Sequence, residues 1–238
     1  MHPYYSKNKS KYLKQINKLM SYAKDETREV FASDYSNILK EVQTAFTEAV
    51  LEDLPFVGGS KNSNDTSNLV GIGQYTALFL VGRKHGIEDH KIGELLTIME
   101  QRHFKPLPGW IQSIVRCLTN RKFAQSFLVR MAVKSRKFGD EYPYAWVYVY
   151  REPDNDYSLK LDCVRCGAWK YLKEKDFLDI MPYVCNIDHV CFASYGLAYY
   201  RNKAIGYGDE LCNNRLKRGG KILTEHWPPH GLKGDGFK

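Results

Sequence analysis

Cysteines are concentrated in one part of the chain, since five of the six lie between Cys163 and Cys212. Cys185 is followed three residues later by Asp188, and in a helix this spacing places the thiol and the carboxylate on one face. A helix that begins at Cys185 would also hold this thiol in its first turn, where the helix dipole lowers a cysteine pKa. A thiolate beside a carboxylate can combine nucleophilic attack with proton transfer. The spacing is therefore compatible with a cysteine–carboxylate catalytic site, which is one of three interpretations.

Two other interpretations of the cysteines remain open. Cys163 and Cys166 are separated by two residues and followed by Gly167, which is the spacing of one half of a zinc ribbon. The other half does not match, because five residues separate Cys185 from Cys191. Free cysteine is also among the most buried residue types, so each thiol could simply belong to the core. Apolar and polar residues alternate along the segment before Cys163, and this alternation favours a core position for its thiol.

Several ordered elements resemble the L-2-amino-thiazoline-4-carboxylic acid hydrolase family. That family carries a cysteine, then a Cys-x2-Asp sequence at the start of a helix, then an arginine, and then a Gly-rich turn followed by Cys-Asp-Phe-Arg. The matching elements here are Cys166, Cys185-Asn186-Ile187-Asp188 nineteen residues after it, Arg201, and Gly208-Asp209-Glu210-Leu211-Cys212-Asn213-Asn214-Arg215. The helical half resembles the family less specifically, through Asn68 and a helix–Gly86–helix pattern over Gln74–Ile98.

The resemblance implies hydrolysis of a small cyclic amidine that carries a carboxylate. The ring carbon between nitrogen and sulfur is attacked, and its bond to sulfur breaks to give an N-carbamoyl amino acid. This chemistry requires a general base and a group that holds the substrate carboxylate. The residues are assigned accordingly: Asp188 to proton transfer, Cys185 and then Cys212 as candidate nucleophiles, and Arg201, Arg215, Cys166 and Asn214 to substrate binding. We expect a small acidic substrate, no cofactor and no metal.

Two departures from the family lie close to this expected site. Asn213-Asn214 replaces the Asp-Phe of the family motif, and Ala204 replaces a frequent threonine. The resemblance therefore leaves the substrate open. Because asparagine cannot transfer a proton at neutral pH, the alternative function is a non-catalytic module that binds or senses a small molecule on the same fold.

Composition narrows the class of protein. The chain has 238 residues, of which 35 are Lys or Arg and 27 are Asp or Glu, so the net charge is +8. No apolar run reaches the roughly 18 residues of a membrane span, and the first residues lack a signal-peptide core. We therefore expect a cytoplasmic protein without a membrane partner. No nucleic-acid-binding motif accompanies the basic charge, so we expect no nucleic acid, while association into a homo-oligomer stays open.

Apolar periodicity predicts a single α+β domain over residues 1–238, with a helical half, a strand-containing half and a tail. Residues 1–135 read as helices, interrupted by an irregular, mobile loop over Gly58–Asp65. Residues 140–218 read as strands Tyr144–Tyr150 and Tyr157–Cys163, helices Ala168–Lys175 and Cys185–Tyr195, and a hairpin of Leu197–Ile205 with Leu211–Arg218. We expect the helical half to pack on an antiparallel sheet, similar to heme-NO-binding and vinyl-reductase-type ligand domains, with a Gly/Pro-rich tail over 219–238.

Overall fold

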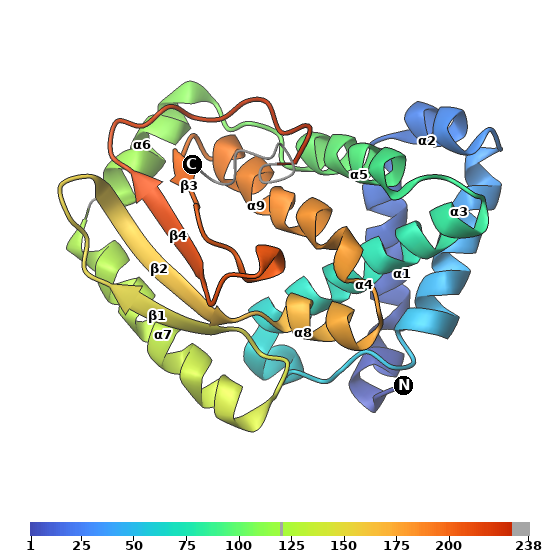
Figure 1. Cartoon of the computed structure of the whole chain (residues 1–238), viewed down its shortest axis with the longest axis horizontal. Helices are drawn as coiled ribbons and strands as arrows, with labels where there is room; N and C mark the ends of the chain where they lie inside the picture. The colour runs from blue at the N-terminus through green and yellow to red at the C-terminus, as the bar shows by residue number, and fades with distance from the viewer. Residues whose placement is uncertain (120, 230–238) are drawn as a thin grey trace.

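The structure is a computed structural model that describes residues 1–119 and 121–229. Within these residues a helical N-terminal half is followed by a four-stranded antiparallel sheet with two further helices, so the predicted α+β class is confirmed (Figure 1). The predicted tail is described only as far as residue 229, and the basic residues Lys233 and Lys238 lie outside the described part.

Helices form where apolar residues recur on one face. The helices of the first half are α1 (Pro3–Ser21), α2 (Lys24–Phe31), α3 (Tyr35–Ala45), η1 (Phe46–Val50, a π-helical turn), η2 (Gly59–Asn62, a 3-10 turn), α4 (Ser63–Lys84), α5 (Asp89–His103), α6 (Gly109–Thr119) and α7 (Lys122–Glu141). α1 buries Tyr5, Tyr12 and Ile16, which recur at helical spacing, in the hydrophobic core of the helical half. Between α4 and α5, Gly86 has a φ of +70°, a left-handed conformation that glycine adopts without strain.

The predicted loop over Gly58–Asp65 is wrong, because this polar segment forms η2 and the start of α4. The Asn62 amide donates to the Val57 carbonyl at 3.0 Å and to Asp65 Oδ2 at 2.9 Å. Asp65 Oδ2 also accepts the Trp146 N–H at 3.0 Å, so the buried carboxylate links α4 to the strand half. Apolar periodicity missed this segment because its buried residues are polar and satisfy one another.

The sheet has the strand order β1-β2-β4-β3, with all neighbours antiparallel. The strands are β1 (Val147–Arg151), β2 (Tyr157–Arg165), β3 (Tyr199–Tyr200) and β4 (Cys212–Lys217). The register places Cys163 of β2 directly opposite Cys212 of β4. Because side chains alternate along a strand, these two cysteines and Asn214 lie on one face, called the inner face here. Asp162 and Arg215 lie on the opposite, outer face.

Two short helices follow β2: α8 (Gly167–Glu174) and α9 (Met181–Ser194), the latter preceded by the 3-10 turn η3 (Leu178–Ile180). The prediction that this last helix begins at Cys185 is wrong, because α9 starts four residues earlier, with Pro182 in its first turn. The predicted hairpin forms, but its first strand is reduced to β3, and the connection to β4 contains the 3-10 turn η4 (Ile205–Tyr207).

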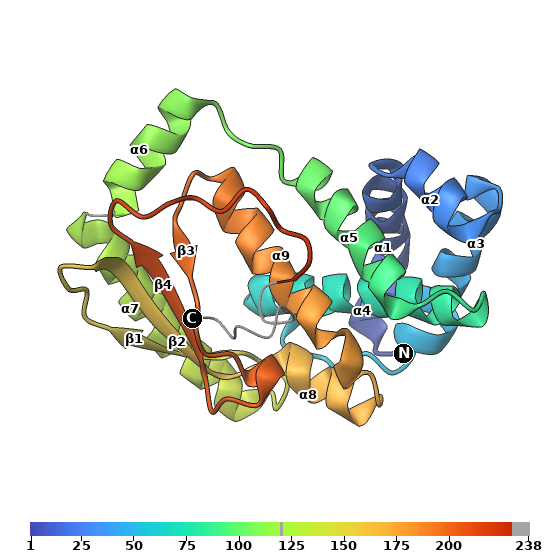
Figure 2. The same cartoon turned by 45° about the horizontal axis from the view of Figure 1, so that its top comes forward.

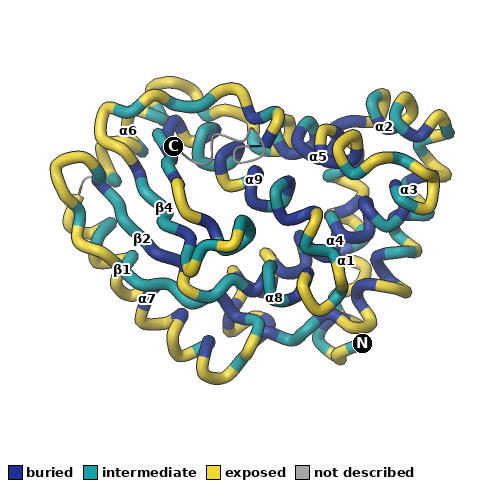
Figure 3. Tube along the Cα trace, in the orientation of Figure 1, coloured by how far each residue is buried: buried dark blue, intermediate teal, exposed yellow. Residues whose placement is uncertain are grey.

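α9 lies between the sheet and the helical half and packs against α5, while α6 and α7 lie at the sheet end of the molecule, remote from α1–α3 (Figures 1 and 2). Buried segments concentrate where α4 and α9 approach the sheet, and exposed segments follow the peripheral helices (Figure 3). The described part of the tail is not detached, since Trp227 stacks on Tyr183 and the His226 carbonyl accepts from Asn186 at 2.6 Å. Nowhere in 1–119 or 121–229 is a helix both long and apolar enough to cross a bilayer.

Candidate functional site

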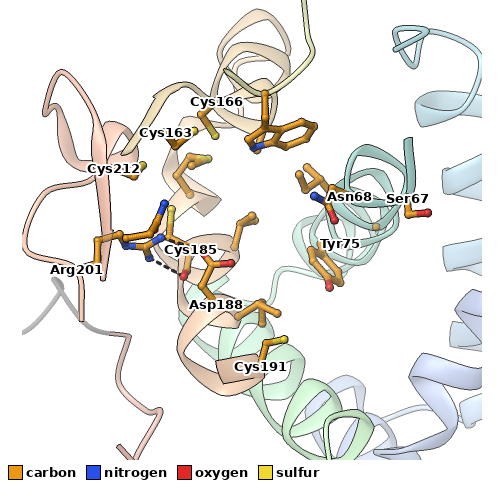
Figure 4. A pocket seen from close by; sticks show the side chains of 18 of the residues that line it. Ser67, Asn68, Tyr75, Cys163, Cys166, Cys185, Asp188, Cys191, Arg201 and Cys212 are labelled. Carbon is orange, nitrogen blue, oxygen red and sulfur yellow. Dashed lines mark hydrogen bonds and ion pairs between the residues drawn. The ribbon is translucent and has the colours of Figure 1, made fainter. Parts of the chain in front are cut away.

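A cavity of about 310 Å³ lies between α4, α9 and the inner face of the sheet (Figure 4). Five of the six cysteines line it: Cys163, Cys166, Cys185, Cys191 and Cys212. The sixth, Cys117, is exposed on α6. None of them forms a disulfide. The thiols that are clustered in the sequence therefore share one cavity.

The strand register creates a thiol pair on the inner face. The Cys163 thiol hydrogen-bonds to Cys212, whose Sγ also accepts the Ile205 N–H at 3.3 Å, and the positive charge of Arg201 lies nearby. The hydrogen bond from Cys163, together with Arg201 and the Ile205 N–H, outweighs burial and lowers the pKa of Cys212 to about 7. The same hydrogen bond, with burial, raises the pKa of Cys163. Cys212 is therefore the cavity thiol that reaches the thiolate form near neutral pH.

The other cavity thiols are held in the neutral form by burial. Desolvation raises the pKa of Cys166 to about 12 and that of Cys191 to about 11, and it also raises the pKa of Cys185. The expectation that a helix dipole activates Cys185 is wrong, because α9 begins at Met181 and Cys185 lies beyond the first turn. Cys166 instead caps α8, where its sulfur accepts the Trp169 N–H at 3.5 Å.

Asp188 and Arg201 form an ion pair at the cavity wall. Arg201 Nη1 donates to Asp188 Oδ2 at 2.7 Å, and Nη2 donates to the Cys185 carbonyl at 2.8 Å. The arginine side chain is only 3% exposed, whereas that of Asp188 is 54% exposed and lines the cavity. The predicted helical face is also found, since Cys185, Asp188 and Cys191 all line this cavity from α9 (Figure 4). Arg201 thus holds a carboxylate that remains open to a bound molecule.

The structure does not bring Arg215 to this group. Arg215 lies on the outer face, where its Nη2 donates to Asp162 Oδ1 at 2.7 Å, and Arg151 donates to the other oxygen of Asp162 at 2.7 Å. Cys212 and Arg215 are an odd number of residues apart in one strand, so they point to opposite faces. Asn214 does line the cavity and accepts a hydrogen bond from the Tyr199 hydroxyl.

The wall opposite the thiols is formed by α4, which contributes Asn68 and Tyr75 (Figure 4). The Tyr75 hydroxyl donates to Glu100 Oε1 at 2.7 Å, and Glu100 Oε2 lies 3.0 Å from His103 Nδ1. Burial, and then the Glu100 charge, raises the pKa of Tyr75. Neither Tyr75, which lines the cavity, nor its hydrogen-bond partner Glu100 was predicted from the sequence. The available signal was that Glu100 follows Leu96 by four residues and so continues the apolar stripe of α5 with a carboxylate.

The zinc interpretation gains no support from the geometry. Across residues 1–119 and 121–229, no group of three or more His, Cys, Asp or Glu side chains is arranged to hold a metal ion. The polar groups that the cavity offers to a bound molecule are the Cys212 thiol, the Asp188 carboxylate, the Arg201 guanidinium and the Asn214 amide.

No family model matches the sequence, no curated protein matches it, and no solved structure matches the fold.

Proposed function

We propose that the protein is a hydrolase that opens a small cyclic amidine, such as 2-amino-thiazoline-4-carboxylate, to an N-carbamoyl amino acid. The observation that carries the proposal is the Cys212 thiol, whose pKa of about 7 sets it apart from the other thiols of a cavity that also contains Asp188. This reverses the order of the two nucleophile candidates, because Cys185 was expected to be the more reactive thiol. A cavity of about 310 Å³ suits a substrate of this small size.

The proposed reaction has two additions to the same carbon. The Cys212 thiolate adds to the ring carbon between nitrogen and sulfur, and the ring carbon–sulfur bond breaks to release a thiolate that takes up a proton. Water then adds to the carbon bound to Cys212, with Asp188 accepting a proton from it, and the bond to the Cys212 sulfur breaks. Asp188 passes its proton to the former ring nitrogen, and the second proton of the water balances the one taken up by the substrate sulfur. One water is consumed, the product carries the freed thiol, and the Cys212 thiolate and the Asp188 carboxylate are regenerated.

Arg201 supports both steps in this proposal. Its charge favours the Cys212 thiolate, and its hydrogen bond at 2.7 Å orients the Asp188 carboxylate toward the cavity. Asn68, on the opposite wall, and Asn214 supply amide groups that can hydrogen-bond to the substrate. Cys166 and Cys185 contribute to the wall of the binding site.

The test is release of free thiol from L-2-amino-thiazoline-4-carboxylate by the purified full chain, with and without a chelator. We expect chelator-insensitive release that falls by about 10²- to 10⁴-fold in Asp188→Asn, because a general base contributes a factor of this size. Asp179→Asn is the matched control, since Asp179 pairs with Arg83 outside the cavity. Release that survives in folded Asp188→Asn would remove this carboxylate from the mechanism, and sensitivity to the chelator would support the zinc interpretation.

One observation favours the alternative, a non-catalytic binding or sensing module. Both arginines expected to hold a substrate carboxylate already pair with carboxylates of the protein, Arg201 with Asp188 and Arg215 with Asp162. Under this alternative the cavity binds a small molecule without converting it. Calorimetric binding of the cyclic amidine without thiol release from the wild-type chain would support the binding module.

A further inference from the structure

The helices α6 and α7 expose apolar side chains that nothing in the described chain covers. Nine large apolar side chains are exposed among the described residues, and seven belong to these two helices: Trp110, Ile114, Leu118, Phe123, Phe127, Val129 and Val133. Trp110 is 69% exposed and Phe127 is 62% exposed. Contiguous exposed apolar side chains are typical of surfaces that contact another protein or a membrane.

α6 is apolar on two sides, and among the described residues only one of these sides packs against the rest of the molecule. Val115 packs against the cluster of Leu197, Tyr199 and Leu216 beside β3 and β4. Trp110 and Ile114, spaced by one helical turn, project away from that cluster and are exposed. Packing against the rest of the molecule therefore does not account for the outward face of α6.

The charged residues of α6 and α7 are all basic up to the last two residues of α7, Asp140 and Glu141. Between Lys105 and Gly139 the chain has eight Lys or Arg residues and no Asp or Glu. Two copies meeting through this surface would bring these cations together, which disfavours a symmetric dimer. Basic side chains beside protruding Trp and Phe are instead typical of helices that lie in the interface of an anionic membrane, with their rings at the level of the lipid headgroups.

We propose that α6 and α7 form a peripheral docking surface for a membrane that contains anionic lipids. The exposed apolar side chains enter the interface, and the surrounding Lys and Arg residues contact lipid phosphates and carboxylates. This proposal is independent of the proposed hydrolase activity. It adds a membrane-surface partner that the sequence analysis did not expect, and it requires no membrane-spanning helix.

The test is cosedimentation of the full chain with two kinds of vesicle, phosphatidylcholine alone and phosphatidylcholine mixed with phosphatidylserine. We expect binding to the anionic vesicles that weakens as salt is added. The double variant Trp110→Gln/Phe127→Gln is expected to weaken this binding by at least about tenfold, because it removes two apolar side chains from the interface. Lys122→Glu/Arg130→Glu is expected to weaken it by a similar factor by reversing two charges.

Matched controls lie away from α6 and α7. Val164→Gln changes an exposed apolar residue on β2, and Lys7→Glu/Lys11→Glu reverses two exposed charges on α1. Both are expected to bind vesicles as the wild type does, and thermal unfolding should show that every variant is folded. Absence of binding to anionic vesicles at low salt would overturn the proposal, as would equal losses in the control variants. A dimer in solution that Trp110→Gln/Phe127→Gln converts to a monomer would also overturn it and assign the surface to a second copy.

Discussion

Two aspartate–arginine sites flank the sheet and differ in what they leave open. On the inner side Asp188 accepts from Arg201, and its side chain is 54% exposed at the cavity. On the outer side Asp162 accepts from Arg151 and Arg215, one on each oxygen, and its side chain is 5% exposed. The outer carboxylate has both oxygens engaged and is shielded from solvent, whereas the inner one is oriented but accessible. Similar ion pairs therefore predict a structural role on one face and a chemical role on the other.

The largest expected effect is on the inner side. Cys212→Ser should lower thiol release by roughly 10³-fold or more, because it removes the proposed nucleophile. Cys191→Ser, a thiol of the same cavity whose pKa burial raises to about 11, should change the rate less than about twofold. Steady-state kinetics measures the rates of both variants. Intact-mass analysis tests for the covalent adduct, which is expected in Cys191→Ser and absent in Cys212→Ser. Wild-type activity in Cys212→Ser would mean that water attacks the substrate directly.

A substitution in the outer ion-pair site should change the stability of the fold and leave the cavity thiol unaffected. Asp162→Asn is expected to lower the free energy of unfolding by about 3 kcal/mol, because it leaves two arginines without their shared carboxylate. The rate at which iodoacetamide alkylates Cys212 should stay unchanged in the folded variant. Denaturant unfolding and alkylation kinetics measure these two quantities. A variant of unchanged stability would show that the outer cluster is not a structural element.

The hydrogen bond between the two thiols gives a pH-dependent prediction. Cys163→Ala removes the main cause of the lowered Cys212 pKa, so this pKa should rise from about 7 toward the ordinary thiol value. Because the thiolate is the reactive form above its pKa, the alkylation rate at pH 7 should fall, and its rise with pH should move to higher pH. An unchanged pH profile would assign the activation of Cys212 to Arg201 and the Ile205 N–H instead.

The smallest expected effect separates the two arginines of the outer site. Arg151 is 52% exposed and Arg215 is 13% exposed. Arg151→Gln should therefore cost less than about 1 kcal/mol of stability, as exposed ion pairs do. Arg215→Gln should cost more than this, and thermal unfolding of the two variants compares them. Equal losses would indicate that the two arginines stabilise Asp162 equally despite their different burial.

Local patterns in the sequence predicted most of the fold. The alternation of side chains predicted the positions of β1 and β2. Helical spacing predicted that Cys185, Asp188 and Cys191 share one face of a helix, and all three line the cavity. The start of α9 was misplaced because its N-cap residue is Ile180, whose side chain makes no capping hydrogen bond. The polar turn before α4 was missed because its stabilisation comes from buried amide and carboxylate contacts.

The candidate site was less predictable because it depends on tertiary pairing. No local pattern specifies that Cys163 faces Cys212, since this follows from the register between β2 and β4. The hydrogen bond that this pairing allows is the largest cause of the lowered pKa of Cys212, to which Arg201 and the Ile205 N–H add. Arg215 was assigned to the site from the motif alone, although strand alternation places its side chain on the other face of the sheet from that of Cys212.

The edges of the sheet have a consequence for self-association. At the β1 edge, the Ser135 hydroxyl of α7 accepts the Tyr148 N–H at 2.9 Å, and α7 packs along this strand. At the other edge, β3 offers only two residues, Tyr199 and Tyr200. Exposed strand edges are the usual templates for pairing between chains and for aggregation. With one edge capped by a helix and the other this short, the sheet is protected against growth by the addition of strands.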